Sequence, residues 1–356
     1  MGSAWKSGLL DSYRGKRVLV TGHTGFKGSW LSLILAHAGA QVTGYALEEP
    51  TDPSLFELAR IDELVDSRTG DIRDFDKLAS VFAEARPEYV FHLAAQPIVR
   101  IGYDEPRRTF ETNVMGTVNV LECVRRSQGV RSVLNVTTDK VYLNADEPDH
   151  AFTEDEPLDG FDPYSNSKSC SELVTHSYAK SFSLPPVSTA RAGNVIGGGD
   201  FAPERLVPDC VRATLAGRPI GVRNPASTRP FQHVLEPLGA YLLIAARQGE
   251  RPELAGAYNV GPDHRDAVTA QRLVELWCTL WGEGADWADA SNPDDPKHEA
   301  AFLELDNSKL KDSFGWSATW GIDQALERTV SWTKDWAAGA DPRMSMLSQI
   351  EEFFAS

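Results

Sequence analysis

The segment Arg17-Val-Leu-Val-Thr-Gly-His-Thr-Gly-Phe-Lys-Gly28 joins a short apolar run to a helical pattern through three evenly spaced glycines. Gly22 would permit a tight turn, Gly25 would let backbone N–H groups approach a pyrophosphate, and Gly28 would let the following helix pack closely. The N-terminus of that helix would add a partial positive charge. A glycine triplet alone is a weak signal, but its place after the first strand predicts a dinucleotide-binding loop.

The first half of the chain alternates short β-branched runs with longer helical patterns. Such alternation predicts βαβ units and hence a Rossmann-type doubly wound α/β fold, with a parallel sheet covered on both faces. We expect strands at 17–21, 41–47, 64–69, 89–93, 132–136, 186–191 and 257–260, and helices at 26–37, 75–85, 109–127, 163–183, 235–247 and 269–281.

After Asn194 this rhythm breaks and prolines become frequent. We expect a dinucleotide-binding domain and a smaller mixed C-terminal substrate lobe, with boundaries at 1–192 plus about 230–265 for the domain and about 193–229 plus 266–356 for the lobe. Gly197-Gly198-Gly199 predicts a flexible loop. Tryptophan buries a large apolar area, so the lobe core is expected to contain most of Trp277, Trp281, Trp287, Trp316, Trp320, Trp332 and Trp336.

Composition excludes several classes of protein. The chain has 356 residues and a net charge of −16, which argues against a protein that coats nucleic acid or an anionic membrane. No apolar run approaches the ~18 residues of a transmembrane helix, and no signal peptide is predicted. The widely spaced cysteines form no CxxC pair, so we expect no metal site and a cytoplasmic protein with four reduced thiols, Cys123, Cys170, Cys210 and Cys278.

Residues at the ends of the predicted strands extend the cofactor site. Asp71 follows the third strand, where a carboxylate can accept from an adenine amino group, although a turn or helix cap would also explain it. No acidic residue ends the second strand, where Tyr45-Ala46-Leu47 stands, so the choice between NAD and NADP stays open. The cofactor set predicted so far is Gly22, His23, Thr24, Gly25, Phe26, Lys27, Gly28, Asp71, Ile72, Leu93, Ala94 and Ala95.

Tyr164-Ser-Asn-Ser-Lys168 places a phenol and an ammonium on one face of a predicted helix. An ammonium beside a phenol stabilises the phenolate and lowers its pKa from ~10. Such a tyrosine can take the proton of a sugar hydroxyl while hydride passes to a nicotinamide. Alone the pattern fits a solvated helix face equally well, but together with the glycine-rich loop it predicts a redox site.

The fifth strand ends in Thr137-Thr138-Asp139-Lys140, at the edge of a parallel sheet where ligands bind. A hydroxyl, a carboxylate and an amine in succession have the composition of a proton-transfer set. The alternative is an exposed ion pair in a turn.

These motifs resemble those of the extended short-chain dehydrogenase/reductase family, and their flanks resemble its CDP-glucose 4,6-dehydratase group. The resemblance covers nearly the whole chain and is carried by Thr21–Trp30, Ala94–Pro97, Thr137–Lys140, Asp162–Lys168, Arg191–Asp200 and Arg229–Leu238. Lys140 is the telling position, because dehydratases of other nucleotide sugars usually carry Glu there. Val141 departs from the usual Cys, and the loop 144–156 lacks the aromatic run common in the group.

The resemblance implies an NAD-dependent dehydration of a nucleotide-activated hexose, with CDP-D-glucose as the first choice. Tyr164 would take the C4 hydroxyl proton, Lys168 would hold the nicotinamide ribose, and Thr138 would hydrogen-bond the C4 oxygen. Asp139 would protonate the leaving C6 hydroxyl, and hydride would return to C6. Lys140 would act as the C5 base or stabilise the enolate, and the sequence does not choose between these roles.

The resemblance also implies ligand and subunit contacts. Asn113, Tyr164 and Lys168 would complete the NAD site, and the nucleotide-sugar site would contain Gln96, Asn194, Arg205, Arg229, His298 and Glu299. Arginines suit a diphosphate because a guanidinium bonds oxygens in pairs, although ordinary surface charge would also explain them. The local charge between 203 and 233 is +3, which supports anion binding there. The helices at 109–127 and 163–183 would pair across a two-fold axis, giving a homodimer or a tetramer.

Three alternatives are kept. The chain could be a 4,6-dehydratase of another nucleotide hexose, or a nucleotide-sugar 4-epimerase or simple oxidoreductase. Asp139-Lys140 argues against the second, because epimerisation needs no elimination acid. A non-catalytic NAD-sensing module is the third, and the intact Thr138, Tyr164 and Lys168 argue against it.

Overall fold

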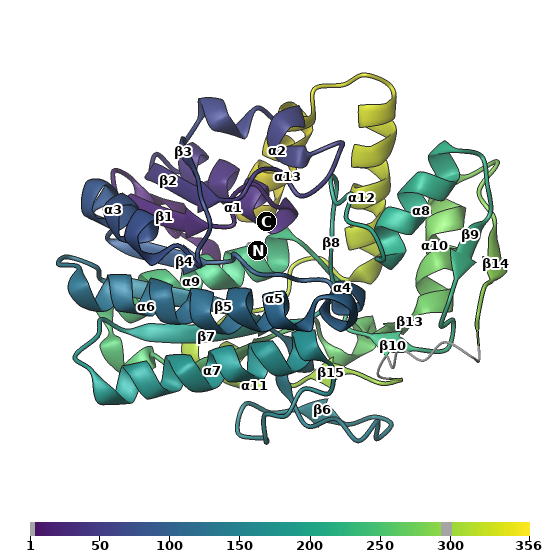
Figure 1. The fold of residues 1–356 in the computed structure, drawn as a ribbon. Coiled ribbons are helices and arrows are strands. Elements are labelled where there is room, and N and C mark those ends of the chain that lie inside the picture. Colours follow the sequence, from purple (N-terminus) through teal and green to yellow (C-terminus); the bar gives the residue numbers. More distant parts are fainter. Residues whose placement is uncertain (1–3, 293–300) are drawn as a thin grey trace.

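A sheet of seven parallel strands runs through the centre of the molecule (Figure 1). The structure, a computed structural model, describes residues 4–292 and 301–356. The strands are β1 (Arg17–Thr21), β2 (Gln41–Ala46), β3 (Asp66–Thr69), β4 (Tyr89–His92), β5 (Ser132–Thr138), β7 (Val187–Ala192) and β12 (Ala257–Val260). Their order is β12-β7-β5-β4-β1-β2-β3, which confirms the predicted Rossmann-type sheet.

Helices cover both faces of this sheet. On β1, Leu19 packs in one hydrophobic cluster while Val18 and Val20 pack in another, as alternation along a doubly covered strand requires. One face carries α1 (Phe26–His37), α2 (Leu55–Leu58), α9 (Leu235–Glu250), α11 (Ser308–Phe314) and α13 (Pro342–Ala355). The other carries α3 (Phe75–Ala85), α6 (Gly116–Arg126) and α7 (Pro163–Ser181), with α4 (Val99–Asp104) and α5 (Pro106–Phe110) packed against α7.

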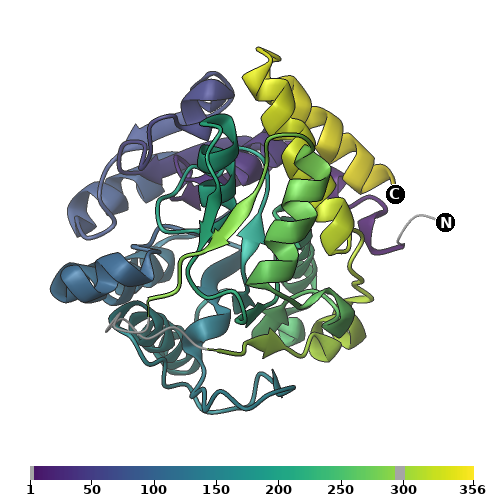
Figure 2. The same cartoon turned by 90° about the vertical axis from the view of Figure 1, so that its right-hand side faces the viewer.

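A smaller lobe has its own hydrophobic cluster, in which Trp277 and Leu273 are fully buried. It is built from α8 (Leu206–Leu215), β9 (Ile220–Val222), α10 (Ala270–Trp281), β14 (Trp287–Asp289) and one face of α12 (Ile322–Ala337). Figure 2 looks onto this lobe and shows α10 beside α12. Short strand pairs complete the fold: β8 (Val195–Ile196) with β11 (Gln232–His233), β10 (Thr228–Arg229) with β13 (Val268–Thr269), and β6 (Ala151–Phe152) with β15 (Glu304–Leu305).

Several elements differ from the sequence-based expectation. The helix expected over 109–127 is interrupted by a π-helical turn, Glu111–Met115, between α5 and α6. The sequence does not predict helices α2, α4, α8, α11, α12 and α13. Single helical turns also occur at Ala4–Lys6, Leu10–Tyr13, Ile61–Glu63, Asp139–Val141, Pro252–Leu254 and His264–Asp266. The division into two domains at the stated boundaries stays a prediction.

Two predictions are wrong in part: that most of the C-terminal tryptophans form the lobe core, and that residues 197–199 form a flexible loop. Trp316, Trp320 and Trp332 belong to the main cluster, not to the lobe cluster. Helix α12 contributes to both the main cluster and the lobe cluster, so Trp332 faces the sheet domain, and Trp316 and Trp320 lie just before this helix. Gly198 is buried beneath them, because a Cβ there would lie 2.1 Å from Trp332 Cγ, and its carbonyl accepts a 3.1 Å hydrogen bond from Trp30 Nε1. The glycines of 197–199 therefore serve close packing.

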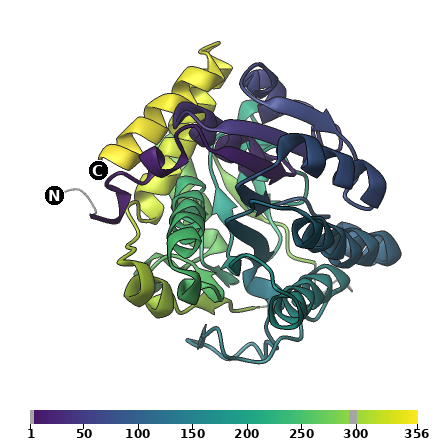
Figure 3. The same cartoon turned by 90° about the vertical axis from the view of Figure 1, so that its left-hand side faces the viewer.

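The first described helical turn, Ala4–Lys6, lies beside the C-terminal helix α13 (Figure 3). Lys6 Nζ donates a 2.6 Å hydrogen bond to the carbonyl of Phe353, which ties the first turn to α13. Among the described residues, no helix combines the length and the apolarity needed to cross a bilayer.

Candidate functional site

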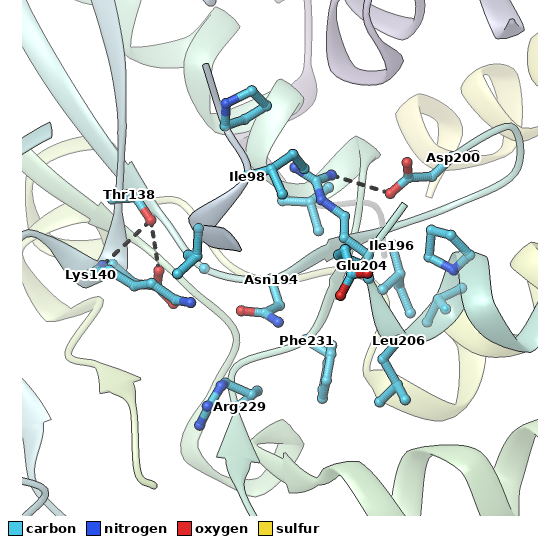
Figure 4. Close-up of a pocket in the computed structure, with 18 of the residues that line it drawn as sticks. Ile98, Thr138, Lys140, Asn194, Ile196, Asp200, Glu204, Leu206, Arg229 and Phe231 are labelled. Carbon is cyan, nitrogen blue, oxygen red and sulfur yellow. Dashed lines mark hydrogen bonds and ion pairs between the residues drawn. The ribbon is translucent and has the colours of Figure 1, made fainter. Parts of the chain in front are cut away.

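A cavity lies where the carboxyl ends of the central strands meet the lobe (Figure 4). Ala95 after β4, Val136 on β5 and Ala192 on β7 form its sheet side, and Leu206 at the start of α8 belongs to its lobe side. This is the edge of a parallel sheet at which α/β proteins bind ligands. The cavity therefore lies where the strand-end motifs predicted it.

The glycine-rich loop has the geometry of a phosphate cradle. Gly22 has φ +76°, and a Cβ there would lie 2.7 Å from the backbone nitrogen of Ala94. A Cβ on Gly28 would lie 2.1 Å from the carbonyl oxygen of Gly22. Gly25 caps α1 without a side chain, so no side chain competes with a ligand for the first N–H groups of the helix. The loop thus fits a dinucleotide pyrophosphate, and the contacts of the individual residues stay predictions.

The polar side chains of this loop point in two directions. His23 is fully buried against β3, where its Nε2 lies 2.8 Å from Ser67 Oγ, and burial lowers its pKa to about 4. Thr24 Oγ1 donates to the carbonyl of Leu47 at 3.0 Å. Phe26 and Lys27 instead line the cavity. Burial, then the nearby cations Arg205 and Lys168, lower the pKa of Lys27 to about 7.

The structure brings all five predicted catalytic residues into this one cavity: Thr138, Asp139, Lys140, Tyr164 and Lys168. Thr138 Oγ1 donates to Asp139 Oδ1 at 2.9 Å, while Asp139 Oδ2 is buried without a hydrogen-bond partner among the described residues. Burial raises the pKa of Asp139, against the opposing charges of Lys140 and Arg229. A carboxyl group whose proton is held more tightly is suited to act as a general acid.

Asp162 fixes the start of the helix that carries the tyrosine and the lysine. Its Oδ1 accepts from the backbone N–H groups of Tyr164 (2.9 Å) and Ser165 (3.1 Å), and Pro163 occupies the first helical position. These local signals place Tyr164 at the beginning of α7, and Lys168 one turn later. The pair therefore faces the end of β5, where Lys168 Nζ donates to the carbonyl of Val136 at 2.9 Å.

The expected lowering of the Tyr164 pKa is wrong for this structure. Burial raises the pKa of Tyr164 to about 12, and its hydrogen bond with Thr138 offsets this only in part. Burial also lowers the pKa of Lys168 to about 8, with Glu172 acting in the opposite direction. Spacing alone could show that the two side chains share a helix face, but it could not show that desolvation dominates at both groups.

The sequence of this chain is similar to those of known dehydratases. A family model described as GDP-mannose 4,6 dehydratase matches residues 19–329. The chain belongs to this dehydratase family. It is 47% identical over 354 residues to a CDP-glucose 4,6-dehydratase of Salmonella typhimurium, covering 97% of this chain and 98% of that protein.

Solved structures share the fold of this chain. The epimerase Mth375 of Methanothermobacter thermautotrophicus has a TM-score of 0.81 and 24% identity, and the match covers 94% of this chain and 97% of the epimerase. The dTDP-glucose 4,6-dehydratase of Bacillus anthracis, solved in complex with NAD, has a TM-score of 0.75 and 24% identity over 92% and 99% of the two chains.

Two of the residues predicted to contact ligands, Asn113 and Gln96, form hydrogen bonds with other protein groups. Asn113 Nδ2 donates to Ser167 Oγ at 2.8 Å, and Asn113 Oδ1 accepts from the backbone N–H of Gln96 at 2.8 Å. The Gln96 side chain bonds Thr109 and the backbone of Ile98. Both side chains are buried among protein groups and neither lines the cavity, so their predicted ligand contacts stay predictions.

The predicted adenine-binding segment lies at a separate shallow hollow. Asp71 lines this hollow, and its carboxylate pairs with Arg73, whose hydrogen bonds lower the pKa of Asp71. The Ile72 side chain packs against Gly116, where a Cβ would lie 2.4 Å from Ile72 Cδ1. The adenine role of Asp71 stays a prediction. Of the three residues after β4, Leu93 and Ala95 line the main cavity, and Ala94 lies against Gly22.

The predicted substrate residues are in part placed in the cavity. Asn194, Arg205 and Arg229 line it, and Figure 4 shows Asn194 and Arg229 on its lower side. Arg205 Nη1 lies 3.3 Å from Asp200 Oδ2. Arg229 is 6% exposed, and its Nη1 donates to the carbonyl of Thr228 at 2.8 Å. The remaining two, His298 and Glu299, lie outside the described residues.

Sequence reasoning missed a buried ion pair behind the catalytic strand. Glu172 accepts from Arg191 Nε (3.1 Å) and Nη2 (3.0 Å), from Thr137 Oγ1 (2.5 Å) and from Thr189 Oγ1 (2.7 Å). The strand residue next to Thr138 is thereby tied to helix α7. The signal was present, because Glu172 continues the four-residue spacing of Tyr164 and Lys168 on one helix face.

Proposed function

We propose that the chain catalyses the NAD-dependent dehydration of CDP-D-glucose to CDP-4-keto-6-deoxy-D-glucose and water. The observation that carries the proposal is the convergence of Thr138, Asp139 and Lys140 with Tyr164 and Lys168 in one cavity beside the glycine-rich loop. The 47% identity to a protein named CDP-glucose 4,6-dehydratase, over 97% of this chain, supports the choice of nucleotide and hexose.

The glycine-rich loop at 22–28 supports NAD as the cofactor. Gly22 and Gly28 leave no room for a Cβ, and Gly25 leaves the first turn of α1 without a side-chain cap. A dinucleotide pyrophosphate fits this arrangement because backbone N–H groups can approach it closely. Bound NAD supplies a hydride acceptor and, once reduced, a hydride donor.

Tyr164 and its neighbours act on the C4 hydroxyl. In its phenolate form Tyr164 takes the hydroxyl proton as C4 is oxidised, and Thr138 hydrogen-bonds the C4 oxygen. The pKa of about 12 means that Tyr164 is protonated at neutral pH, so the base form needs electrostatic support. Lys168, on the same helix face, supplies that support in its ammonium form.

Asp139 and Lys140 act on the elimination. The C4 ketone acidifies the C5 hydrogen, and Asp139, whose pKa burial raises, gives its proton to the C6 hydroxyl, which leaves as water. Two roles remain for Lys140: it removes the C5 proton, or it stabilises the enolate. Hydride return to C6 and addition of a proton at C5 then complete the product without net consumption of NAD.

The test is incubation of the purified protein with CDP-glucose in deuterated water. We expect a 4-keto-6-deoxy product carrying solvent deuterium at C5, because the C5 proton is lost and replaced. Turnover of a dTDP, GDP or UDP hexose with CDP-glucose left untouched would contradict the nucleotide choice but keep the reaction. Formation of a C4 epimer without C5 deuterium would contradict the dehydration itself.

We also propose a cytoplasmic homodimer or dimer of dimers. Leu173 on α7 is 54% exposed, and Met115, in the π-helical turn between α5 and α6, is 51% exposed. These apolar side chains lie on the helices expected to pair across a two-fold axis. The four free cysteines suit a reducing compartment. Sedimentation that shows a monomer at every concentration would contradict the assembly.

A further inference from the structure

One carboxylate, that of Glu204, contacts two arginines, Arg100 and Arg223. We call this partly solvent-exposed side of the cavity its mouth. Glu204 Oε2 lies 3.2 Å from Arg100 Nε, and it also contacts Arg223 Nη1. Arg100 belongs to α4 of the sheet domain, and Arg223 follows β9 of the lobe. All three side chains line the cavity, and Figure 4 shows Glu204 between Asn194 and Leu206. A single acidic side chain thus holds together cations from two parts of the fold.

The loop that carries Glu204 repeats this arrangement with a second carboxylate. Asp200 pairs with Arg205, one of the arginines expected to bind the substrate. The carboxylates of Asp200 and Glu204 therefore face three arginines, Arg100, Arg205 and Arg223. An anionic ligand that binds these guanidinium groups would need the positions that the two carboxylates occupy.

The conformation and the exposure of Glu204 allow a ligand anion to take the place of its carboxylate. Its φ of +62° lies in the left-handed region, which is unfavourable for a residue with a Cβ. The Glu204 side chain is 41% exposed, and those of Arg100 and Arg223 are 24% and 36% exposed. The Glu204–Arg223 pair, more than a third exposed on both sides, is of the kind that is individually weak, whereas the Arg100 side of the cluster is less exposed. A stronger anion can therefore replace the carboxylate without dismantling a buried network.

We propose that Glu204 is an internal substitute for the substrate diphosphate, and that Arg100 and Arg223 bind this diphosphate when Glu204 is displaced. The inference rests on the proposed function, because its ligand is a nucleoside-diphosphate hexose. A diphosphate diester offers two charges and several acceptor oxygens, which guanidinium forks bond in pairs. Glu204 then competes with the nucleotide, so the protein binds diphosphates less tightly than its arginines alone would allow.

The experiment measures dissociation constants by calorimetry for three probes: CDP, cytidine and inorganic pyrophosphate. Glu204→Gln is expected to bind CDP and pyrophosphate about three- to fivefold more tightly than the unchanged protein, since the Glu204 carboxylate no longer competes for Arg100 and Arg223. Cytidine affinity should not change, because cytidine carries no phosphate. Glu351→Gln, an equal charge change on the exposed side of α13, is the matched control and should leave all three constants unchanged.

The arginines are tested by Arg100→Gln and Arg223→Gln. Each is expected to weaken CDP and pyrophosphate binding about tenfold, and the gain from Glu204→Gln should shrink when either arginine is also replaced. Unchanged or weaker diphosphate binding by Glu204→Gln overturns the proposal. An equal change in cytidine affinity also overturns it, because Glu204 would then contact the base. The pyrophosphate measurements hold even if CDP-glucose is not the substrate, so the two failures can be told apart.

Discussion

The end of the catalytic strand and the mouth of the cavity are both held by Glu–Arg pairs, but in opposite environments. The Glu172 and Arg191 side chains are each 4% exposed, whereas those of Glu204 and Arg223 are 41% and 36% exposed. Removing one partner of a buried pair costs about 3–5 kcal/mol, while an exposed pair contributes about 0–1 kcal/mol. The same chemistry therefore gives a fixed frame in one place and an exchangeable contact in the other.

The positions of the two pairs match what each region has to do. Glu172 lies one turn beyond Lys168 and bonds Thr137, so it fixes both sides of the catalytic set. Glu204 lines the cavity and is 41% exposed to solvent. A region that positions reacting atoms benefits from a network that does not open. A region that admits a ligand benefits from contacts that the ligand itself can replace.

The largest effect is expected from Tyr164→Phe, which removes the proton acceptor and leaves the frame intact. The turnover number should fall about 10²- to 10⁴-fold, as loss of a general base does. CDP affinity and thermal stability should stay close to those of the unchanged protein. Turnover assays with calorimetry and a thermal melt check this. More than a tenth of the original activity would mean that Tyr164 is not the base.

The next largest effect is expected from Glu172→Gln, which leaves the Arg191 guanidinium buried without its counter-charge. Unfolding free energy should fall by about 3 kcal/mol, and the turnover number by about 10- to 100-fold. Glu172 raises the pKa of Lys168, so its neutralisation lowers that pKa further below about 8. The alkaline limb of the pH–rate profile should therefore move to lower pH, because the ammonium form is the active one.

A purely structural role for Glu172 would lower stability without moving that alkaline limb. The comparison between buried and exposed pairs would fail if Glu172→Gln and Glu204→Gln changed stability equally. Denaturant titration of both variants, with Glu351→Gln as the surface control, measures this difference.

The smallest effect is expected from Arg223→Gln at the cavity mouth. KM for the nucleotide sugar should rise several-fold, while the turnover number stays within about twofold, because the reacting atoms are not repositioned. The salt dependence of KM should weaken, since one charge contact to phosphate is gone. A large fall in turnover with unchanged KM would show that the mouth, too, belongs to the rigid frame.

Local signals explain why much of the fold and site could be predicted from the sequence. The strand–glycine–helix segment at 17–28 contains its own turn chemistry, and Tyr164 and Lys168 lie one helical turn apart. The strand-end rule placed Thr138 and Asp139 in the cavity before any contact was known. These features depend on neighbours in the chain, so the sequence displays them directly.

The features that were missed depend on residues far apart in the chain. Arg191 lies on a strand and Glu172 on a helix, and only tertiary packing brings them together. Trp332 packs on Gly198, which is far from it in the chain, so the sequence predicts the wrong core for this tryptophan. The sequence predicts the wrong direction for the pKa of Tyr164 because burial, which spacing does not reveal, outweighs the hydrogen bond with Thr138 and the charge of Arg205.

The most direct test of the proposed reaction uses CDP-glucose labelled with deuterium at C4. C4 oxidation followed by hydride return predicts a 4-keto-6-deoxy product in which NMR finds the deuterium at C6. Deuterium retained at C4 of an epimer, or absent from C6 of the product, would contradict the proposed function.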